Sequence, residues 1–302
     1  MQHPNLFLVG HPRSGTGTWD GFLKQHPDVF MGAKELHYFG KDLCFNDPPR
    51  SLSNYLSYFN SAADHKYIGD SSTWYLASSD AAQEIYSFCP QAKIIISLRN
   101  PVSWLYSLHA HQHFAAYEPI ADFQEALNAE PLRQGGAAPK HVYPHFGLLY
   151  RSLLCYDKQV ARFLQKFNPD QVFITFVDDL KNDIGGELER MCSFLELPLS
   201  QEIQDQFFKS AKRHRNANHK HRIQKLHRWI KTPPRRSILF GMQHPLIPGS
   251  RFFLRALHKA NMTTEPRKPI DEDLKSQLTD ECTPMIQRLE ELIGKDLSMW
   301  YR

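Results

Sequence analysis

The residues best suited to chemistry in this sequence lie in a short polar turn near its start. Four apolar residues at positions 6–9 predict a buried strand, and apolar residues at helical spacing from Trp19 onward predict a helix after the turn. A turn that joins a strand to a helix N-terminus binds anions through its backbone N–H groups, and glycines there let a phosphate approach closely. The residues that we expect to contact such an anion are Arg13, Ser14, Gly15, Thr16, Gly17 and Thr18.

The turn differs from a nucleotide-binding P-loop at the positions that matter for phosphoryl transfer. Gly10 and Gly15 have P-loop spacing, but Thr16 and Gly17 stand where a P-loop has Lys and then Ser or Thr. The lysine that holds the terminal phosphates and the hydroxyl that holds Mg²⁺ are therefore both missing. A small-molecule kinase is an alternative function, but the missing lysine argues against it.

A second set of anion-binding residues follows the clearest strand of the sequence. Residues 93–98 are a continuous apolar, β-branched run typical of a central parallel strand, and Arg99-Asn100-Pro101 follows it. Pro101 suits the first turn of a helix, and that helix carries Ser107. An Arg fork with a nearby hydroxyl is suited to a terminal phosphate monoester.

A third cluster, Lys34-Glu35-Leu36-His37-Tyr38-Phe39, follows a predicted second strand at residues 29–31. The carboxyl end of a strand is where open α/β sheets bind ligands. A carboxylate sheltered by aromatic rings has a raised pKa and is suited to act as a general base, so Glu35 is a candidate. A surface Lys–Glu ion pair without a catalytic role is the alternative.

These three clusters together resemble the PAPS-dependent sulfotransferases, which transfer sulfate from 3′-phosphoadenylyl sulfate (PAPS). Pro12-Arg13-Ser14-Gly15-Thr16 is similar to the family's 5′-phosphosulfate loop, and Arg99-Asn100-Pro101 with Ser107 to its 3′-phosphate motif. The Lys-Glu-x-His-x-Phe segment follows that loop in bacterial and glycan members. The resemblance implies that Glu35 takes the acceptor's proton, with His37 as neighbour or substitute, and that Arg13 stabilises charge on the departing 5′-phosphate.

The resemblance also implies the fold and further contacts. The expected fold is α/β, a P-loop-NTPase-like three-layer arrangement with a central parallel sheet flanked by helices, plus a mostly helical C-terminal extension. The segment Gly69-Asp70-Ser71-Ser72-Thr73-Trp74-Tyr75-Leu76 resembles one that lines the acceptor cleft. Expected substrate contacts are Lys34, His37, Ser71 and Tyr75. Within residues 213–222, relatives carry a basic loop over the nucleotide, for which Arg222 is the leading candidate.

Length and charge fit one domain of residues 1–302, with an α/β core at 1–200 and a basic extension at 201–302 that covers the donor site. Between Asp205 and Glu265 there are fourteen Lys and Arg and no acidic residue. Such segregation indicates an anionic partner or a solvated basic face. A non-enzymatic protein that binds polyanions or membrane surfaces is therefore the second alternative.

Several further expectations concern cofactors, location and local structure. PAPS is the expected co-substrate and its bisphosphate (PAP) the product; no metal is expected, because His109, His111 and His113 lack an evident third ligand on one helix face. The acceptor is a small molecule, lipid or carbohydrate, and we expect no nucleic-acid partner. Scattered cysteines, no apolar run of ~18 residues and no leader at the N-terminus favour a cytoplasmic protein. We expect residues 114–144 to be rich in loops and to cover the acceptor side, and one long helix at about 146–166.

Overall fold

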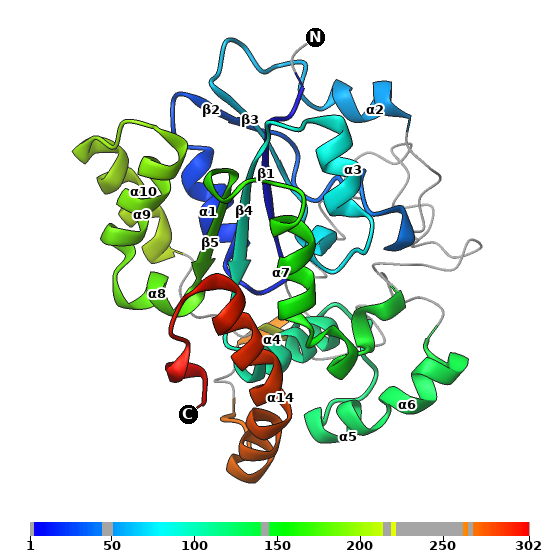
Figure 1. Ribbon diagram of the computed structural model, residues 1–302. Coiled ribbons are helices and arrows are strands. Elements are labelled where there is room, and N and C mark those ends of the chain that lie inside the picture. Colours follow the sequence, from blue (N-terminus) through cyan, green and yellow to red (C-terminus); the bar gives the residue numbers. More distant parts are fainter. Residues whose placement is uncertain are drawn as a thin grey trace.

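A parallel five-stranded sheet forms the centre of the molecule (Figure 1). The computed structural model describes residues 3–43, 51–139, 145–213, 219–221, 262–264 and 268–301. The strand order is β2-β3-β1-β4-β5, so β1 lies in the middle, with Leu6 beside Gly69 on one side and Lys93 on the other. The strands are β1 Leu6–Gly10, β2 Val29–Met31, β3 Tyr67–Ser71, β4 Lys93–Leu98 and β5 Val172–Phe176.

Helices cover both faces of this sheet because its strands are apolar on both sides. Phe7 and Val9 of β1 point into a core that includes residues of α3, α4, α7 and α14. Leu6 and Leu8 point into a second core with α1, α9 and α10. The helices are α1 Thr16–Leu23, α2 Leu52–Ser57, α3 Ala81–Phe88, α4 Pro101–Phe114, α5 Phe123–Asn128, α6 Glu130–Leu132, α7 Tyr156–Leu164, α8 Val177–Asn182, α9 Ile184–Leu195, α10 Gln201–Arg213 and α14 Glu272–Ile293. The expected three-layer α/β fold is confirmed.

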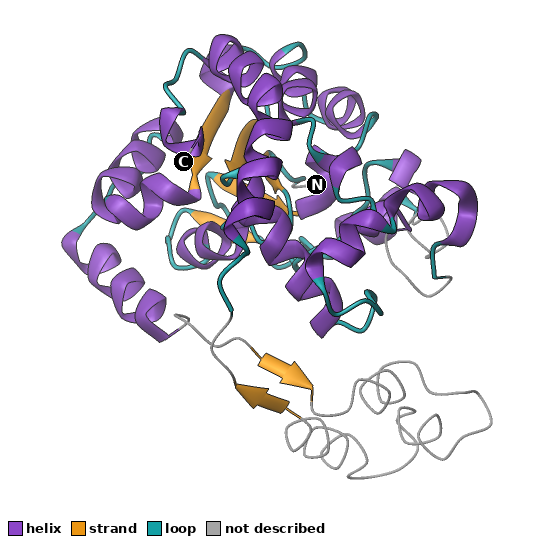
Figure 2. Cartoon of the chain, turned by 90° about the horizontal axis from the view of Figure 1, so that it is seen from below, coloured by secondary structure: helices purple, strands orange, loops and turns teal. Residues whose placement is uncertain are grey.

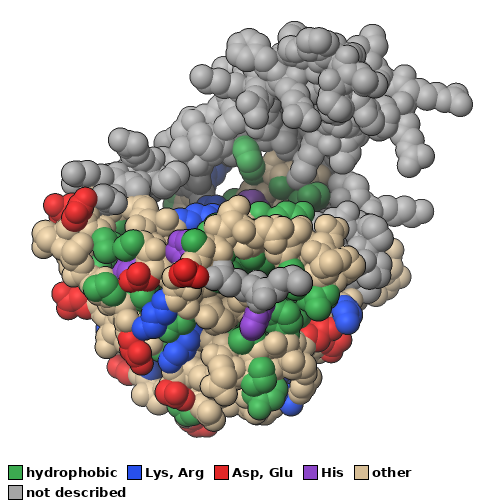
Figure 3. Space-filling model, turned by 90° about the horizontal axis from the view of Figure 1, so that it is seen from above, with side chains coloured by type: hydrophobic (Ala, Val, Ile, Leu, Met, Phe, Trp, Pro, Cys, Tyr) green, Lys and Arg blue, Asp and Glu red, His purple; other side chains and the backbone are tan. Residues whose placement is uncertain are grey.

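Shorter elements complete the described chain. A two-stranded antiparallel sheet, β6 His219–His221 with β7 Met262–Thr264, lies outside the main body (Figure 2). The one-turn segments are η1 Lys41–Leu43, η2 Thr73–Leu76, η3 Arg133–Ala137 (a π-helical turn), η4 His145–Leu148, η5 Arg151–Leu153, η6 Pro169–Gln171 and η7 Ser298–Tyr301. Among the helices described, none has the length and apolar character needed to cross a membrane. On the face in Figure 3, the described acidic and basic side chains are interspersed with apolar ones.

Two expectations about local structure were wrong. The predicted helix at 146–166 is helical only at α7, and η4 and η5 precede it. The Glu130 carboxylate accepts hydrogen bonds from the amides of Arg151 (2.7 Å) and Ser152 (2.9 Å), which removes those amides from a continuous helix. The region predicted as loops, 114–144, contains α5, α6 and η3, and Asp122 caps α5 by accepting from the Glu125 amide at 2.9 Å.

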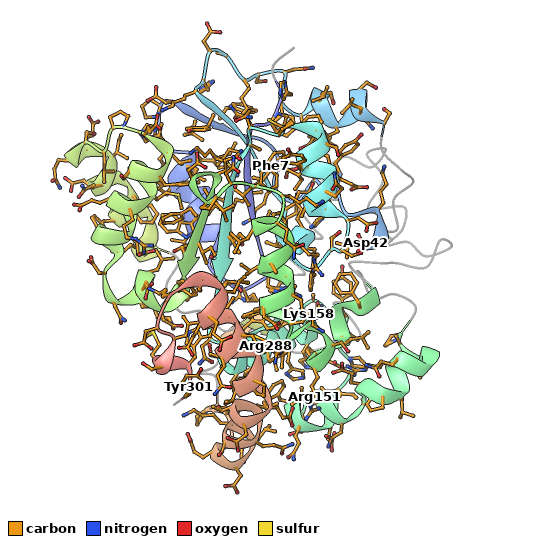
Figure 4. The ribbon with its side chains drawn as sticks, in the orientation of Figure 1. Phe7, Asp42, Arg151, Lys158, Arg288 and Tyr301 are labelled. Atoms are coloured by element: carbon orange, nitrogen blue, oxygen red, sulfur yellow. The ribbon has the colours of Figure 1, made fainter. Side chains whose placement is uncertain are left out.

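Both described helices beyond residue 200 pack directly on the body of the protein. Phe207 of α10 contacts Phe22 of α1 with ring centroids 5.4 Å apart. Two arginines lie where α14 packs against α7 and the turn before it: Arg151 of η5 and Arg288 of α14 (Figure 4). Arg151 pairs with Glu281 of α14 at 2.8 Å, and Arg288 pairs with Asp157 of α7 at 2.6 Å. The boundary at residue 200 stays a prediction.

Candidate active site

The turn between β1 and α1 presents unpaired backbone amides at the carboxyl edge of the sheet. Gly15 precedes α1 with φ 86°, a left-handed conformation that favours glycine. The amides of residues 15–17 donate to no backbone acceptor within the described part of the chain. Three free N–H groups at the positive end of a helix are the elements of an anion site. The predicted anion loop therefore has the backbone features of an anion site, and its binding role stays a prediction.

Side chains that the sequence motifs did not single out hold this turn in place. Trp104 of α4 donates its indole N–H to the Pro12 carbonyl at 2.8 Å, and Ser97 of β4 donates to the Ser14 carbonyl. A Cβ added at Gly10 would stand 2.7 Å from the Ser97 carbonyl oxygen, so only glycine allows this close approach of β1 and β4. His11 stacks on Tyr156, and burial lowers its pKa to about 4. A neutral His11 thus forms the floor of the turn.

Of the predicted loop side chains, only some reach the surface. Ser14 and Thr16 are buried, with 0% and 4% of their surface exposed, whereas Gly17 is exposed and Thr18 is partly exposed. The Ser14 hydroxyl has no hydrogen-bond partner in the described structure. The loop therefore offers an incoming anion its amides and the Arg13 side chain first, with Thr18 beside them.

Arg13 and Arg99 lie next to each other, although 86 residues separate them in the sequence. Arg13 donates from Nε to the Ser107 hydroxyl at 3.3 Å, and Arg99 donates from Nη1 to the Arg13 carbonyl at 3.2 Å. Burial and the charge of Arg13 lower the pKa of Arg99, yet a guanidinium stays charged at neutral pH. Two cations from different loops and a hydroxyl from α4 thus converge beside the unpaired amides.

Arg99 is held by a residue that the sequence analysis did not select. Its Nε donates to the Ser103 hydroxyl at 3.1 Å, in the first turn of α4. The spacing of Arg99 and Ser103, four residues apart across a helix start, is the signal that would have indicated this contact. A cavity of about 300 Å³ opens beside Arg99, and its lining includes Ser103, Asp178, Lys181 and Trp300.

The predicted base lies in the segment that follows β2. Glu35 keeps 38% of its side-chain surface exposed, and its carboxylate lies 3.6 Å from Nε2 of His37. Partial burial raises the pKa of Glu35, while the charge of Lys34 opposes the rise. The Lys34 ammonium stands 3.7 Å from the position that a Cβ on Gly17 would occupy, so it lies over the start of α1. The base cluster and the anion loop are therefore neighbours.

Backbone strain is concentrated at the same residues. The described chain has five non-glycine residues with positive φ. Three of them are predicted site residues: Arg13 at 72°, Glu35 at 61° and His37 at 48°. Left-handed backbone at such residues costs free energy and persists where the surrounding structure enforces it, most often at functional sites.

A model of the family described as "Sulfotransferase domain" matches residues 3–237 of this sequence. The chain belongs to the sulfotransferase family. Heparan sulfate glucosamine 3-O-sulfotransferase 6 of Homo sapiens is 31% identical over 194 residues, 64% of this chain and 52% of that protein. Bifunctional heparan sulfate N-deacetylase/N-sulfotransferase 1 of Caenorhabditis briggsae is 26% identical over 204 residues, 65% of this chain and 23% of that protein. This chain thus spans about half of such curated relatives, or less.

Solved structures agree with the sulfotransferase fold. A sulfotransferase from Alicyclobacillus acidocaldarius superimposes with a TM-score of 0.70 at 24% identity, over 100% of both chains. The sulfotransferase domain from the curacin biosynthetic pathway gives 0.50 at 14% identity, over 96% of this chain and 99% of that one. The assignment made from the motifs is confirmed at the level of family and fold.

Three remaining expectations concern the substrate contacts Ser71 and Tyr75, the basic residue Arg222 and the absence of a metal site. Ser71 and Tyr75, predicted to contact substrate, are 2% and 0% exposed. Arg222 lies outside the described residues. Within the described part, no three His, Cys, Asp or Glu side chains gather in a group that could hold a metal, and His109 and His113 face the carbonyls of Ile120 and Glu118 at 3.0 Å.

Proposed function

We propose that this sulfotransferase moves the sulfuryl group of PAPS to a hydroxyl or amine of a carbohydrate acceptor and releases PAP. The observation that carries the proposal is the convergence of Arg13, Arg99 and Ser107 beside the unpaired amides of residues 15–17. PAPS carries a 5′-phosphosulfate and a 3′-phosphate, so its donor site needs two anion-binding groups close together. Neither guanidinium lies within ion-pair distance of a carboxylate in the described chain, although the charge of Asp178 acts on Arg99 from further away, so both remain able to bind such a ligand.

The chemistry assigned to each residue follows from its position. The acceptor oxygen or nitrogen attacks sulfur, the bond between sulfur and the 5′-phosphate oxygen breaks, and the acceptor's proton passes to Glu35. Arg13, the loop amides and Lys34 stabilise the negative charge that collects on the 5′-phosphate. Arg99 and Ser107 bind the 3′-phosphate and orient the donor. Arg13 acts through its charge, since a guanidinium is a poor proton donor at neutral pH.

A carbohydrate acceptor is the most specific version that the relatives support. Two of the matching proteins are named as heparan sulfate sulfotransferases, one acting on an oxygen and the other on nitrogen. Glu35 lies at a partly exposed position where an acceptor can reach it. A cytoplasmic location remains a prediction from the sequence.

A direct transfer experiment tests this function. Purified full-length protein is incubated with ³⁵S-labelled PAPS and, in separate reactions, a de-N-acetylated heparosan oligosaccharide, an N-sulfated one and a simple phenol. We expect label on an oligosaccharide and stoichiometric release of PAP without added Mg²⁺. Label on the phenol alone would overturn the carbohydrate assignment, and no PAP release with any acceptor or with extracts of the producing cells would overturn the reaction. Product formation that required ATP and Mg²⁺ would favour the kinase alternative.

A further inference from the structure

A buried carboxylate at the end of β3 receives three hydroxyl hydrogen bonds. Asp70 has no exposed surface. Its Oδ2 accepts from the hydroxyls of Tyr55 (2.8 Å) and Tyr75 (2.9 Å), and its Oδ1 accepts from Ser72 (2.7 Å). Burial raises the pKa of Asp70, and these three donors oppose the rise. No cation of the described chain pairs with it, so its retention in the core needs an explanation other than an ion pair.

Two of these donors, Tyr75 and Ser72, also accept hydrogen bonds from the segment that carries the proposed base. The Tyr75 hydroxyl accepts from the amides of Tyr38 (2.9 Å) and Phe39 (3.4 Å). The Ser72 hydroxyl accepts from the amide of His37 at 3.1 Å. A hydroxyl has one proton to donate, and an ionised carboxylate can only accept. Tyr75 and Ser72 therefore donate their hydroxyl hydrogens to Asp70, and the hydroxyl oxygens accept from the amides of residues 37–39.

The segment held in this way is the strained one. Glu35 and His37 have φ of 61° and 48°, and their conformation persists only if contacts outside the segment enforce it. The Glu35 amide is fixed to the Ser71 carbonyl at 2.9 Å, again at the end of β3.

The C-terminal end of the segment, at Gly40 and Asp42, forms separate hydrogen bonds with residues at the start of α3. The Gly40 amide donates to Glu84 at 2.7 Å, and Asp42 (labelled in Figure 4) accepts from the Ser79 amide at 2.8 Å. The contacts through Asp70 hold residues 37–39, between the Glu35–Ser71 hydrogen bond and this C-terminal end.

We propose that Asp70 is a positioning residue for sulfuryl transfer. It orients the Tyr75 and Ser72 hydroxyls so that they hold the turn bearing Glu35 and His37 in place. This inference rests on the proposed function, in which Glu35 takes the acceptor's proton. It also replaces the expected contact of Tyr75 with substrate by an indirect role, since the Tyr75 hydroxyl is fully occupied by Asp70 and by the backbone.

The structure supplies a matched pair of variants for the test. Tyr75→Phe and Tyr55→Phe each remove one hydroxyl bonded to Oδ2 of Asp70. Of the two, only Tyr75 also accepts from amides of the strained segment. The Tyr55 ring stacks on Tyr38 with ring centroids 4.3 Å apart, and a phenylalanine at position 55 keeps this contact. Asp70→Asn completes the set, and melting temperatures verify that each variant folds.

Three readouts separate positioning from general structural support. Hydrogen exchange of the amides of residues 37–39 is measured with PAP bound, PAP affinity is measured by calorimetry, and kcat is measured against pH with the N-sulfated heparosan oligosaccharide. In Tyr75→Phe and Asp70→Asn we expect about tenfold faster exchange at these amides, about tenfold lower kcat and PAP affinity within twofold of wild type. The acid limb of the pH profile moves to lower pH, because a loosened Glu35 becomes better solvated. Tyr55→Phe stays within twofold throughout.

Other outcomes have distinct meanings. If Tyr75→Phe matches Tyr55→Phe in exchange and kcat, or if PAP affinity falls in parallel with kcat, the positioning role is wrong. If wild-type protein sulfates no acceptor, or Glu35→Gln keeps full turnover, the proposed function fails instead. The exchange rates at residues 37–39 still decide whether Asp70 holds the turn in that case.

Discussion

Removing Arg99 tests the donor site most directly. The described structure uses two of its five N–H donors, toward Ser103 and the Arg13 carbonyl, which leaves the others for a phosphate. One hydrogen bond to a charged group contributes about 1.5–3 kcal/mol, and each 1.4 kcal/mol is tenfold in affinity. Arg99→Ala should therefore weaken PAP binding by about 10- to 150-fold. Ser107 accepts from Arg13 and keeps its own proton to donate, so Ser107→Ala should cost about tenfold.

Isothermal titration calorimetry with PAP measures these losses without knowledge of the acceptor. Arg190→Ala serves as the control, because this arginine of α9 is half exposed and pairs with Glu187, and it lies on none of the loops assigned to the donor. We expect its affinity for PAP within twofold of wild type. Arg99→Lys should recover part of the affinity through charge while losing the fork. An Arg99→Ala protein that bound PAP as tightly as Arg190→Ala would refute the assignment of the 3′-phosphate to this site.

Three further predictions address the base, the loop and the core. Glu35→Gln should leave PAP affinity unchanged and lower kcat by about 10²-fold or more. The proposed base acts when deprotonated, and burial raises the pKa of Glu35, so wild-type kcat/KM should fall as the pH drops through a value above the usual range for Glu. Glu35→Gln should show no such fall when PAP release is measured across the same pH range. Gly15→Ala should destabilise the protein by about 1–2 kcal/mol in urea unfolding and weaken PAP binding, because φ is 86° there and the new Cβ would meet Val177 at 3.0 Å. Glu118→Ala should lower the free energy of unfolding in urea by about 3–5 kcal/mol, because the buried guanidinium of Arg133 loses the carboxylate that pairs with it at 2.8 Å and keeps the Leu148 carbonyl as an acceptor; unchanged stability would show that water reaches that charge.

The sequence could predict those parts of the site that depend on local order along the chain. A strand, a glycine-containing turn and a helix follow one another without interruption from Leu6 to Leu23, and the structure has them as β1 and α1. The same holds for β4 followed by Arg99 and α4. Residues at the carboxyl ends of parallel strands meet at one edge of the sheet, so the proximity of Arg13 and Arg99 follows once both strands are recognised.

What the sequence could not supply are contacts across long separations. Nothing in the local pattern at residues 146–166 indicates that the Glu130 carboxylate takes the amides of Arg151 and Ser152 and interrupts the helix. The same limit applies to Asp70, whose motif suggested a lining of the acceptor cleft. Its burial and its bonds to Tyr55 and Tyr75 depend on tertiary packing, which a run of polar and aromatic residues does not encode locally.

The order of the strands explains why the site divides into two halves. β1 lies between β4 and β3, so the loop after β1 has Arg99 on one side and the hydroxyls that follow β3 on the other. β2 pairs with β3, which places the segment with Glu35 next to those hydroxyls. The residues proposed to bind the donor's anions and the proposed base therefore lie on opposite sides of β1, and the start of α1, with Lys34 over it, lies between them. Because each half is supported by its own strand pair, changes on the β4 side should act on nucleotide affinity and changes on the β3 side on turnover.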